Sequence, residues 1–418
     1  MLQHADTAVA DTKAIRLTSE RAALHHVGRA DGSNTPSVLE RFFRGKRVLV
    51  ISPQPWDSIH LSKHHYAKEI AQYADKLFFL EPPRPQNKNI SVNQLAENEN
   101  ITIVSCSEAT PRWVRFKARW LYRYWIKYYV GQLTAVIGEV DVVWCFDTNL
   151  YPDPRRFGGT TTLYHVVDPV PYQRQIAVGA QTDAVVCISP RILKRFDGIL
   201  TEHRKLVVNH GLSDVFLESN AQFTEQTQES ANGIVRFGYC GNLTRAQIDH
   251  ESLRLIIDRH PDVEFHFWGP YEGSDAGSSP ERFVRYLQSK DNVLLHGRVS
   301  TAELAVAIQD MSGFLLAYRA DNLETDNSNS HKILEYLSTG KVIVSKSIEY
   351  YHGSPLFETA ADESVEAFVT TFTDVLRRID HCNRPELSAM RRDFAASQTY
   401  AGQLGRIISF LMNTTVKH

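Results

Sequence analysis

The 418-residue sequence predicts an α/β protein with two doubly wound, Rossmann-like lobes that face a central cleft. Short apolar runs rich in β-branched residues alternate with segments of helical period, which is the pattern of parallel strands joined by crossover helices. A polar segment at 218–233 interrupts this pattern, and the pattern then restarts. The chain is also long enough for two hydrophobic cores rather than one.

The first lobe is predicted over residues 45–217, after a polar N-terminal segment, 1–44, that we expect to be a flexible tail. This tail contains acids and histidines but no apolar stretch, so it lacks the features of a secretory signal. Near-continuous apolar runs in the lobe predict strands that helices cover on both faces. These runs are RVLVIS, KLFFLE, ITIVS, DVVWCF, TTLYHVV, AVVCIS and KLVVNHG.

The second lobe is predicted over residues 234–396, with 218–233 as the linker between the lobes. Its strands are predicted in VRFGYCG, VEFHFWG, NVLLHG, GFLLAY and KVIVS. The last segment, 397–418, predicts an amphipathic helix that could lie against either lobe, including a return to the first. Its apolar residues at helical spacing are Leu404, Ile407, Ile408 and Leu411.

Charge and cysteine content restrict the class of protein. The formal net charge is −2, so nothing in the composition requires a nucleic-acid partner. The five cysteines are scattered and form no C-x-x-C pair, which suits a reduced protein of the cytoplasm. No run of eighteen or more apolar residues occurs, and we therefore expect any membrane contact to be peripheral.

A ligand is expected at the carboxyl ends of the strands, where open parallel sheets bind ligands. In the second lobe, the run VRFGYC leads directly into Gly241 and Asn242. Glycine lets the backbone approach a ligand closely, and the next helix offers free amides to an anion. The alternative is an ordinary strand-to-helix turn, which occurs in every α/β protein.

The segment NSNSHKILEYLSTGKVIV, 327–344, strengthens the prediction of an anion site. Its small polar residues, up to Ser330, predict a helix cap with the helix beginning near His331. Lys332 then lies in the first turn, where the helix dipole disfavours a cation, and a bound diphosphate would offset that cost. Glu335, one turn further, could reach a neutral polyol such as ribose. The alternative is a surface pair of Lys332 and Glu335 with no ligand.

The stretch HKILEYLSTGKVIVS resembles the donor-site segment of GT-B glycosyltransferases, commonly written P-x-K-x-x-E-Y-x-A-x-G-x-P-V-V. VRFGYCGNL, HPDVEFHFWGP, NVLLHGRVSTAEL and GFLLAYR precede it in the order of the donor domain, and the resemblance covers roughly residues 140–345. The sequence is most similar to family-four enzymes and to teichuronic- or xanthan-type glucuronosyl transferases of bacterial surface polysaccharide synthesis.

This resemblance implies a metal-independent enzyme that transfers a sugar from a nucleotide sugar, expected to be a UDP-sugar, to a saccharide or a lipid-linked saccharide. The nucleotide sugar is a substrate, and no cofactor is implied. Gly241 and Asn242 would approach the donor phosphates and Lys332 would hold the diphosphate. Glu335 would bind the ribose. The full set of donor-binding residues implied in this way is Gly241, Asn242, Arg245, Gly297, Arg298, Ser330, His331, Lys332 and Glu335.

The sequence departs from the family pattern at two positions. Many retaining members carry a second glutamate eight residues before the ribose-binding one, and Asn327 stands there. Ser330 replaces the usual proline. Retention or inversion of the sugar configuration is therefore open.

An inverting enzyme needs a base for the acceptor hydroxyl, and the first lobe offers candidates at its strand ends. These catalytic candidates are Asp57, His165 and Asp168. His165 has the alternative role of a core histidine. We expect the acceptor near the start of the first crossover helix, at Trp56, Lys63 and His64, where the two basic residues could meet an anionic acceptor.

The segment 112–129 predicts a helix with the composition of a membrane-interface helix. Basic residues recur at helical spacing beside aromatic ones, and no acid interrupts them. The basic residues are Arg112, Arg115, Arg119, Arg123 and Lys127, and the aromatic residues beside them are Trp113, Phe116, Trp120 and Tyr124. A peripheral contact with an anionic membrane would place the protein at the inner face of the cytoplasmic membrane. Alternatively, the aromatic rings pack on the lobe and the basic groups lie in water.

Other functions fit the same two-lobed fold. A nucleotide-sugar epimerase would turn over the donor without an acceptor. A non-catalytic sugar-nucleotide-binding assembly subunit would bind the donor without transferring it. A two-lobed solute-binding module would normally be exported, and no export signal is visible in the sequence.

Overall fold

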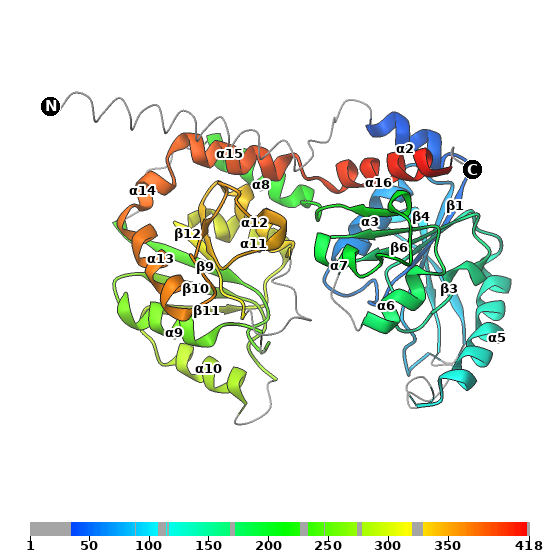
Figure 1. The fold of residues 1–418 in the computed structure, drawn as a ribbon, viewed down its shortest axis with the longest axis horizontal. Coiled ribbons are helices and arrows are strands. Elements are labelled where there is room, and N and C mark those ends of the chain that lie inside the picture. Colours follow the sequence, from blue (N-terminus) through cyan, green and yellow to red (C-terminus); the bar gives the residue numbers. More distant parts are fainter. Residues whose placement is uncertain are drawn as a thin grey trace. The chain divides into compact units, whose positions relative to one another are not determined.

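The computed structural model describes residues 35–87, 89–107, 114, 117–167, 172–225, 233–245, 247–273, 278–319 and 329–415. These residues form two compact units, each with its own hydrophobic core (Figure 1). The N-terminal unit contains residues up to Gly211 and the final segment from Tyr400. The C-terminal unit runs from Leu212 to Thr399.

An eight-stranded sheet forms the centre of the N-terminal unit, in the order β3-β4-β2-β1-β5-β6-β7-β8 among the described residues. Neighbouring strands are parallel, except that the edge strand β3 is antiparallel to β4. Each of the seven predicted runs contains one of these strands. The strands are β1 (Arg47–Ile51), β2 (Lys76–Leu80), β3 (Ser91–Leu95), β4 (Asn98–Ser105), β5 (Val142–Cys145), β6 (Thr161–Val166), β7 (Ala184–Cys187) and β8 (Lys205–Val207).

Helices cover both faces of this sheet, because successive strand residues point to opposite sides. Leu49 and Ile51 of β1 pack in the core that contains residues of α5, whereas Val48 and Val50 pack in the core that contains residues of α2, α3 and α16. The helices are α2 (Thr35–Phe43), α3 (Ser62–Ala71), α5 (Arg119–Ile137), α6 (Tyr172–Gly179), α7 (Pro190–Lys194) and α16 (Tyr400–Thr415), with single 3₁₀ turns at Pro154–Phe157 and Glu202–Arg204.

Residues 35–43, which the composition assigned to the flexible tail, instead form α2. Leu39 and Phe43 are fully buried on one side of this helix, so an apolar face fixes it to the unit. Helix α16 packs against α2 and α3, with Leu404 and Ile407 buried. The last segment of the chain is therefore part of the N-terminal unit.

A six-stranded parallel sheet forms the centre of the C-terminal unit, in the order β11-β10-β9-β12-β13-β14 among the described residues. All five predicted runs contain a strand. The strands are β9 (Arg236–Cys240), β10 (Glu264–Trp268), β11 (Val293–Gly297), β12 (Gly313–Leu316), β13 (Val342–Ser345) and β14 (Glu358–Thr359). The prediction of two doubly wound parallel-sheet lobes is confirmed.

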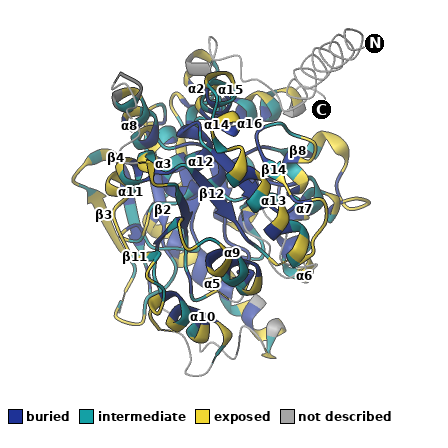
Figure 2. Ribbon diagram, turned by 90° about the vertical axis from the view of Figure 1, so that its left-hand side faces the viewer, coloured by how far each residue is buried: buried dark blue, intermediate teal, exposed yellow. Residues whose placement is uncertain are grey.

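Helices again lie on both faces of this second sheet. Figure 2 shows buried residues concentrated in the strands and exposed residues on the outer sides of the helices. The helices are α8 (Asp214–Glu225), α9 (His250–Arg259), α10 (Ser279–Gln288), α11 (Thr301–Ala307), α12 (Lys332–Ser338), α13 (Val365–Arg377), α14 (Ile379–Cys382) and α15 (Pro385–Ala396), with 3₁₀ turns at Ile308–Asp310 and Glu349–Tyr351.

Residues 218–225, which the polar composition assigned to a linker, are the second part of α8. Phe216 and Ser219 on this helix are buried, and the Ser219 hydroxyl donates a hydrogen bond to the carbonyl of Ala305 at 2.9 Å. These buried side chains fix α8 to the C-terminal unit although its sequence is rich in polar residues. Residues 226–232 of the predicted linker lie outside the described residues.

The first residue of α16 packs closely against Gly211. A Cβ atom at this position would lie 2.3 Å from the ring of Tyr400, the first residue of α16. Gly211→Ala should therefore displace the ring and destabilise the N-terminal unit by about 1 to 3 kcal/mol. Thermal unfolding followed by circular dichroism would measure this loss.

Gly131→Ala is the matched control, because Gly131 lies in α5 with no atom within 4 Å of a Cβ there. This substitution should leave the melting temperature unchanged or raise it, since alanine favours a helix by roughly 0.5 to 1 kcal/mol over glycine. Equal melting temperatures for the two variants would contradict the close packing at Gly211.

Candidate functional site

The carboxyl end of β9 is held by its neighbours in the C-terminal unit. The backbone N–H of Cys240 donates to the Tyr336 hydroxyl of α12 at 2.6 Å, and the N–H of Gly241 donates to the carbonyl of Trp268 at 2.7 Å. A Cβ atom on Gly269, the residue after β10, would lie 2.0 Å from the carbonyl oxygen of Gly241. Glycine is therefore required where these two strand ends approach each other.

Lys332 of α12 lies directly against this glycine turn. A Cβ atom on Gly241 would be 2.2 Å from the Lys332 ammonium, so a side chain at this position would displace the charge from where it lies. The ammonium donates to the Tyr318 hydroxyl at 3.0 Å and lies 5.2 Å from the centre of the Tyr239 ring. The predicted pair of Gly241 and Lys332 is thus together at one strand end, with two tyrosines that the sequence did not indicate.

The charge of Lys332 changes the acidity of its tyrosine partner. Burial alone would raise the pKa of Tyr318, but the Lys332 ammonium, the Tyr239 hydroxyl and Arg245 outweigh it, and the pKa lies below its usual value. The pKa of Tyr239 is raised, mainly by burial. The ammonium therefore imposes a positive potential on the space around the strand end.

Glu335 lies one turn along α12 from Lys332, and its side chain is 16% exposed. Burial raises the pKa of this carboxyl to about 7, although the nearby Lys332 charge acts in the opposite direction. One carboxylate oxygen is 3.8 Å from Nε2 of His331, too far for a hydrogen bond. Near neutral pH this carboxyl is only partly ionised and can donate as well as accept a hydrogen bond.

The start of α12 differs in detail from the prediction. The helix begins at Lys332 with His331 as N-cap in helical geometry, and no side chain caps it. Ser330 instead contributes its carbonyl oxygen, which accepts a hydrogen bond from the N–H of Ile333 at 3.0 Å. The Ser330 hydroxyl does not cap the helix, and its predicted contact with a phosphate stays a prediction.

The remaining donor-site candidates lie after β9 and β11. The Asn242 side chain accepts hydrogen bonds from the backbone and hydroxyl of Thr244, at 2.9 and 2.7 Å, and so shapes the turn after Gly241. Arg245 and Arg298 are exposed. Gly297 has a left-handed φ of 69°, and its carbonyl accepts a hydrogen bond from Gly269 at 2.7 Å.

Gly269 is a residue of this site that the sequence analysis missed. Each of three predicted strand runs ends in glycine, namely VRFGYCG, VEFHFWG and NVLLHG. The structure places these glycines at the ends of the adjacent strands β9, β10 and β11. The repeated terminal glycine was the signal that could have identified it.

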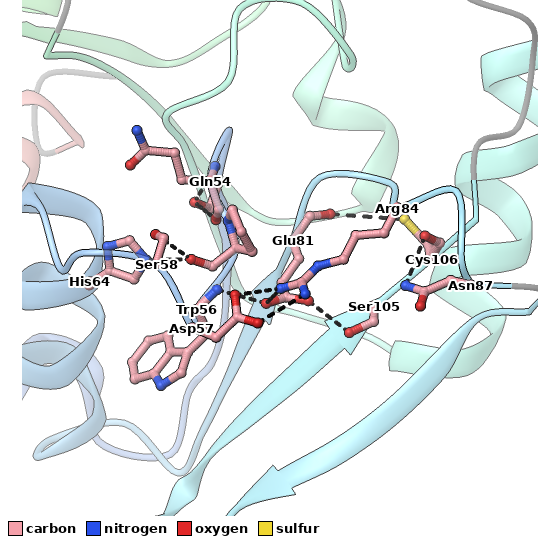
Figure 3. Close-up of polar contacts among 12 residues, drawn as sticks. Gln54, Trp56, Asp57, Ser58, His64, Glu81, Arg84, Asn87, Ser105 and Cys106 are labelled. Atoms are coloured by element: carbon pink, nitrogen blue, oxygen red, sulfur yellow. Dashed lines mark hydrogen bonds and ion pairs between the residues drawn. The ribbon is translucent and has the colours of Figure 1, made fainter. Parts of the chain in front are cut away.

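A second polar site lies in the N-terminal unit, at the carboxyl ends of β1, β2 and β4 (Figure 3). Both carboxylate oxygens of Asp57 accept hydrogen bonds from the Arg84 guanidinium, at 2.8 and 3.0 Å, and these bonds lower the pKa of Asp57. A cavity of about 340 Å³ opens beside this pair. It is lined by Trp56, Asp57, Glu81, Arg84, Asn87, Asn93, Gln94, Leu95, Ala96, Ile103 and Ser105.

Buried Glu81 organises this cavity and was not predicted. Its carboxylate accepts hydrogen bonds from the N–H of Trp56 at 2.7 Å, the Ser105 hydroxyl at 2.8 Å and Arg84 at 3.1 Å. Its side chain is 4% exposed, whereas that of Asp57 is 69% exposed. Arg84 therefore has one buried partner and one exposed partner. Figure 3 shows its contacts with both.

The other acceptor-site candidates are in the interior of the unit. Lys63 and His64 of α3 are buried. Nδ1 of His64 accepts the N–H of Leu61 at 3.0 Å, and Nε2 lies 3.1 Å from the carbonyl of Pro55. Burial lowers the pKa of His64 to about 4. His64 therefore holds the start of α3. The predicted contact of Lys63 and His64 with an acceptor stays a prediction.

His165 is likewise in the core. It is 1% exposed, and its Nδ1 accepts a hydrogen bond from the Trp144 indole at 3.3 Å. Burial lowers its pKa to about 3, so the imidazole is neutral. This environment favours the alternative of a core histidine over a base that touches an acceptor. Asp168 lies outside the described residues.

Within the described ranges, no three His, Cys, Asp or Glu side chains are grouped so that they could hold a metal ion. No family model matches the sequence, and no curated protein sequence matches it.

Many solved structures, however, share this fold. Sucrose-phosphate synthase from Thermosynechococcus elongatus is 12% identical with a TM-score of 0.62, and the match covers 88% of this chain and 99% of that one. A trehalose-6-phosphate structure from E. coli bound with UDP-2-fluoro glucose is 12% identical with a TM-score of 0.63, over 87% and 98% of the two chains. HepE from Anabaena, in complex with UDP and glucose, is 11% identical with a TM-score of 0.63, over 88% and 99%.

These matches extend over nearly the whole of each solved chain and include both parallel-sheet units. At this level of sequence identity they establish the fold. The chain has the GT-B architecture, as the order of its strand and donor-segment motifs predicted.

The raised pKa of Glu335 predicts a specific pH dependence of stability. Between about pH 4.5 and 7 the folded protein keeps a proton that the unfolded chain releases, so stability falls as the pH rises through this range. Glu335→Gln removes this pH-dependent loss of stability, because glutamine does not ionise. The variant's free energy of unfolding should exceed that of the wild type by roughly 3 kcal/mol at pH 8, and the gain should fade towards pH 4.5.

Urea unfolding at several pH values would measure this difference. Glu303→Gln is the control, because hydrogen bonds from Ser300 lower the pKa of Glu303 and its loss should give no gain at pH 8. An identical pH profile for wild type and Glu335→Gln would show that this carboxyl is not buried as described.

Proposed function

We propose that the protein is a glycosyltransferase that moves a sugar from a nucleotide-sugar donor to a saccharide acceptor. The observation that carries this proposal is the Lys332 ammonium held against Gly241 at the end of β9, with Glu335 one turn away. A cation beside an open glycine turn suits a diphosphate, and a partly protonated carboxyl suits the hydroxyls of a ribose. The GT-B fold and the donor-segment resemblance support the same assignment.

In this reaction the bond between the anomeric carbon and the diphosphate oxygen breaks, and a bond from the acceptor oxygen to that carbon forms. Negative charge develops on the departing nucleoside diphosphate, and Lys332 lies where it would stabilise that charge. Its contact with Tyr318 keeps the ammonium in place before the donor binds, so little reorganisation is needed. The acceptor hydroxyl gives up a proton to a base or to the departing phosphate.

We propose a UDP-sugar as the donor, since the E. coli and HepE structures contain UDP-2-fluoro glucose and UDP. The acceptor would enter the cavity of the N-terminal unit, where amide and hydroxyl side chains such as Asn87, Asn93 and Ser105 match the hydroxyls of a saccharide. A growing or lipid-linked saccharide of bacterial surface polysaccharide synthesis fits the resemblance to family-four and teichuronic- or xanthan-type enzymes. The reaction would then take place in the cytoplasm, at the inner face of the membrane.

Donor binding can be tested by thermal shift with nucleotides and nucleotide sugars. UDP or a UDP-sugar should raise the melting temperature, because a ligand that binds only the folded state stabilises it. Lys332→Met should weaken UDP binding by about tenfold or more, since a charge-assisted contact to the diphosphate is lost. Lys290→Met is the control, because Lys290 pairs with Asp258 at the surface of α9 and α10. No shift with any nucleotide would overturn the proposal.

Two aspartates remain candidates for the base that accepts the acceptor proton. Asp57 would have to leave Arg84 first, because its hydrogen bonds lower its pKa. Asp57→Asn or Asp168→Asn should abolish transfer to an acceptor while the thermal shift with UDP persists. Product analysis by mass spectrometry would measure transfer. If a variant keeps the wild-type turnover, the aspartate that it replaces is not the base.

A further inference from the structure

Helix α5 is fixed to the N-terminal unit along one side. The hydroxyls of Tyr122 and Tyr129 donate hydrogen bonds to the carbonyls of Leu150 and Ser107, at 2.7 and 2.9 Å. Ile126 is buried between them in the core that covers one face of the sheet. The opposite side of this helix, cyan in Figure 1, therefore faces outward.

The outward side carries aromatic rings where a water-facing helix normally carries polar groups. Trp120, Tyr124 and Tyr128, which we call the aromatic row, are 77%, 77% and 66% exposed. They follow one another at a spacing of four residues, so they form a line about 12 Å long on one side of the helix. Of the four aromatic residues predicted to line this segment, Trp120 and Tyr124 do not pack on the unit. Trp113 and Phe116 lie outside the described residues.

Positive charge accompanies the aromatic row. Between Ala109 and Gly138 the sequence contains six basic residues and no acidic one. They are Arg112, Arg115, Lys117, Arg119, Arg123 and Lys127. Lys117 and Lys127 are exposed. Lys127 lies three residues after Tyr124 in the sequence and directly before Tyr128, so its charge lies on the same outward side of the helix as these two rings.

We propose that the aromatic row and the basic residues around it bind the surface of an anionic lipid membrane. Tryptophan and tyrosine combine an apolar ring with a polar N–H or O–H group and settle at the headgroup level of a bilayer. Lysine and arginine lay their apolar stems in the same zone and direct their charges to the lipid phosphates. A helix fixed on one side and aromatic on the other is suited to lie in the plane of the interface.

This binding is peripheral. No helix among the described residues is both long and apolar enough to cross a bilayer. The inference rests on α5 and on the basic residues that precede it in the sequence. It does not depend on the proposed transfer reaction, so the two can fail separately.

Flotation of the full chain with lipid vesicles tests the proposal. Vesicles of phosphatidylcholine with about one third phosphatidylglycerol should carry the protein to the top of the gradient, and pure phosphatidylcholine should carry much less. Lys127→Glu should reduce the bound fraction about fivefold or more, because each basic group contributes about that factor at an anionic surface. Raising the salt concentration should release the wild-type protein.

Replacing the aromatic row by Trp120→Ser, Tyr124→Ser and Tyr128→Ser together should lower partitioning about tenfold or more, since the apolar contribution is lost. Tyr172→Ser on α6 and Lys194→Glu on α7 are matched controls, because each replaces an exposed side chain of the same unit away from α5. All variants should keep the wild-type melting temperature, which separates loss of binding from loss of folding.

Three results would overturn the proposal. The first is equal flotation with neutral and anionic vesicles, and the second is equal loss of binding in the α5 variants and their controls. The third is retention on single-stranded RNA beads without any flotation, which would assign the same surface to nucleic acid.

Discussion

The strands of each sheet have to bury both of their faces, and this constraint decides where the protein can place polar chemistry. In β13, Val342 and Val344 pack into one core of the C-terminal unit, and Ile343 between them packs into the other. A charged side chain at any of these positions would be buried without a partner, at a cost of several kcal/mol. The charges of the two polar sites are therefore found where strands end, with Lys332 against Gly241 after β9 and Glu81 after β2.

The two carboxyls near these strand ends differ in the way they tolerate burial. Glu81 stays 4% exposed because three donors, from Trp56, Ser105 and Arg84, complete its hydrogen bonds. No comparable set of hydrogen bonds to Glu335 is found among the described residues, and burial raises its pKa to about 7. A carboxyl with completed hydrogen bonds organises the protein around it, whereas one that changes its protonation is suited to meet a ligand. This contrast favours Glu335 as a binding residue and Glu81 as a positioning one.

Much of the fold could be predicted from the sequence, because a strand covered on both faces needs a continuous apolar run, and all twelve predicted runs contain a strand. Two described strands were missed. The residues of β3 are mostly exposed and β14 is only two residues long, so neither has such a run. In the site, Lys332 and Gly241 could be found from local pattern alone. Tyr318 and Arg84 could not, since their importance arises from partners distant in the sequence, Lys332 and Asp57.

Helix α5 shows where pattern and packing have to be combined. Its tyrosines are chemically alike, yet Tyr122 and Tyr129 are buried and Tyr124 and Tyr128 are exposed. Composition cannot separate these pairs. The spacing of the aliphatic residues does separate them. Four aliphatic residues recur with helical period on one side of α5, and this side must face the sheet. They are Ile126, Val130, Leu133 and Ile137. Once they fix the orientation of the helix, the residues on its opposite side must face outward, and these are Trp120, Tyr124 and Tyr128.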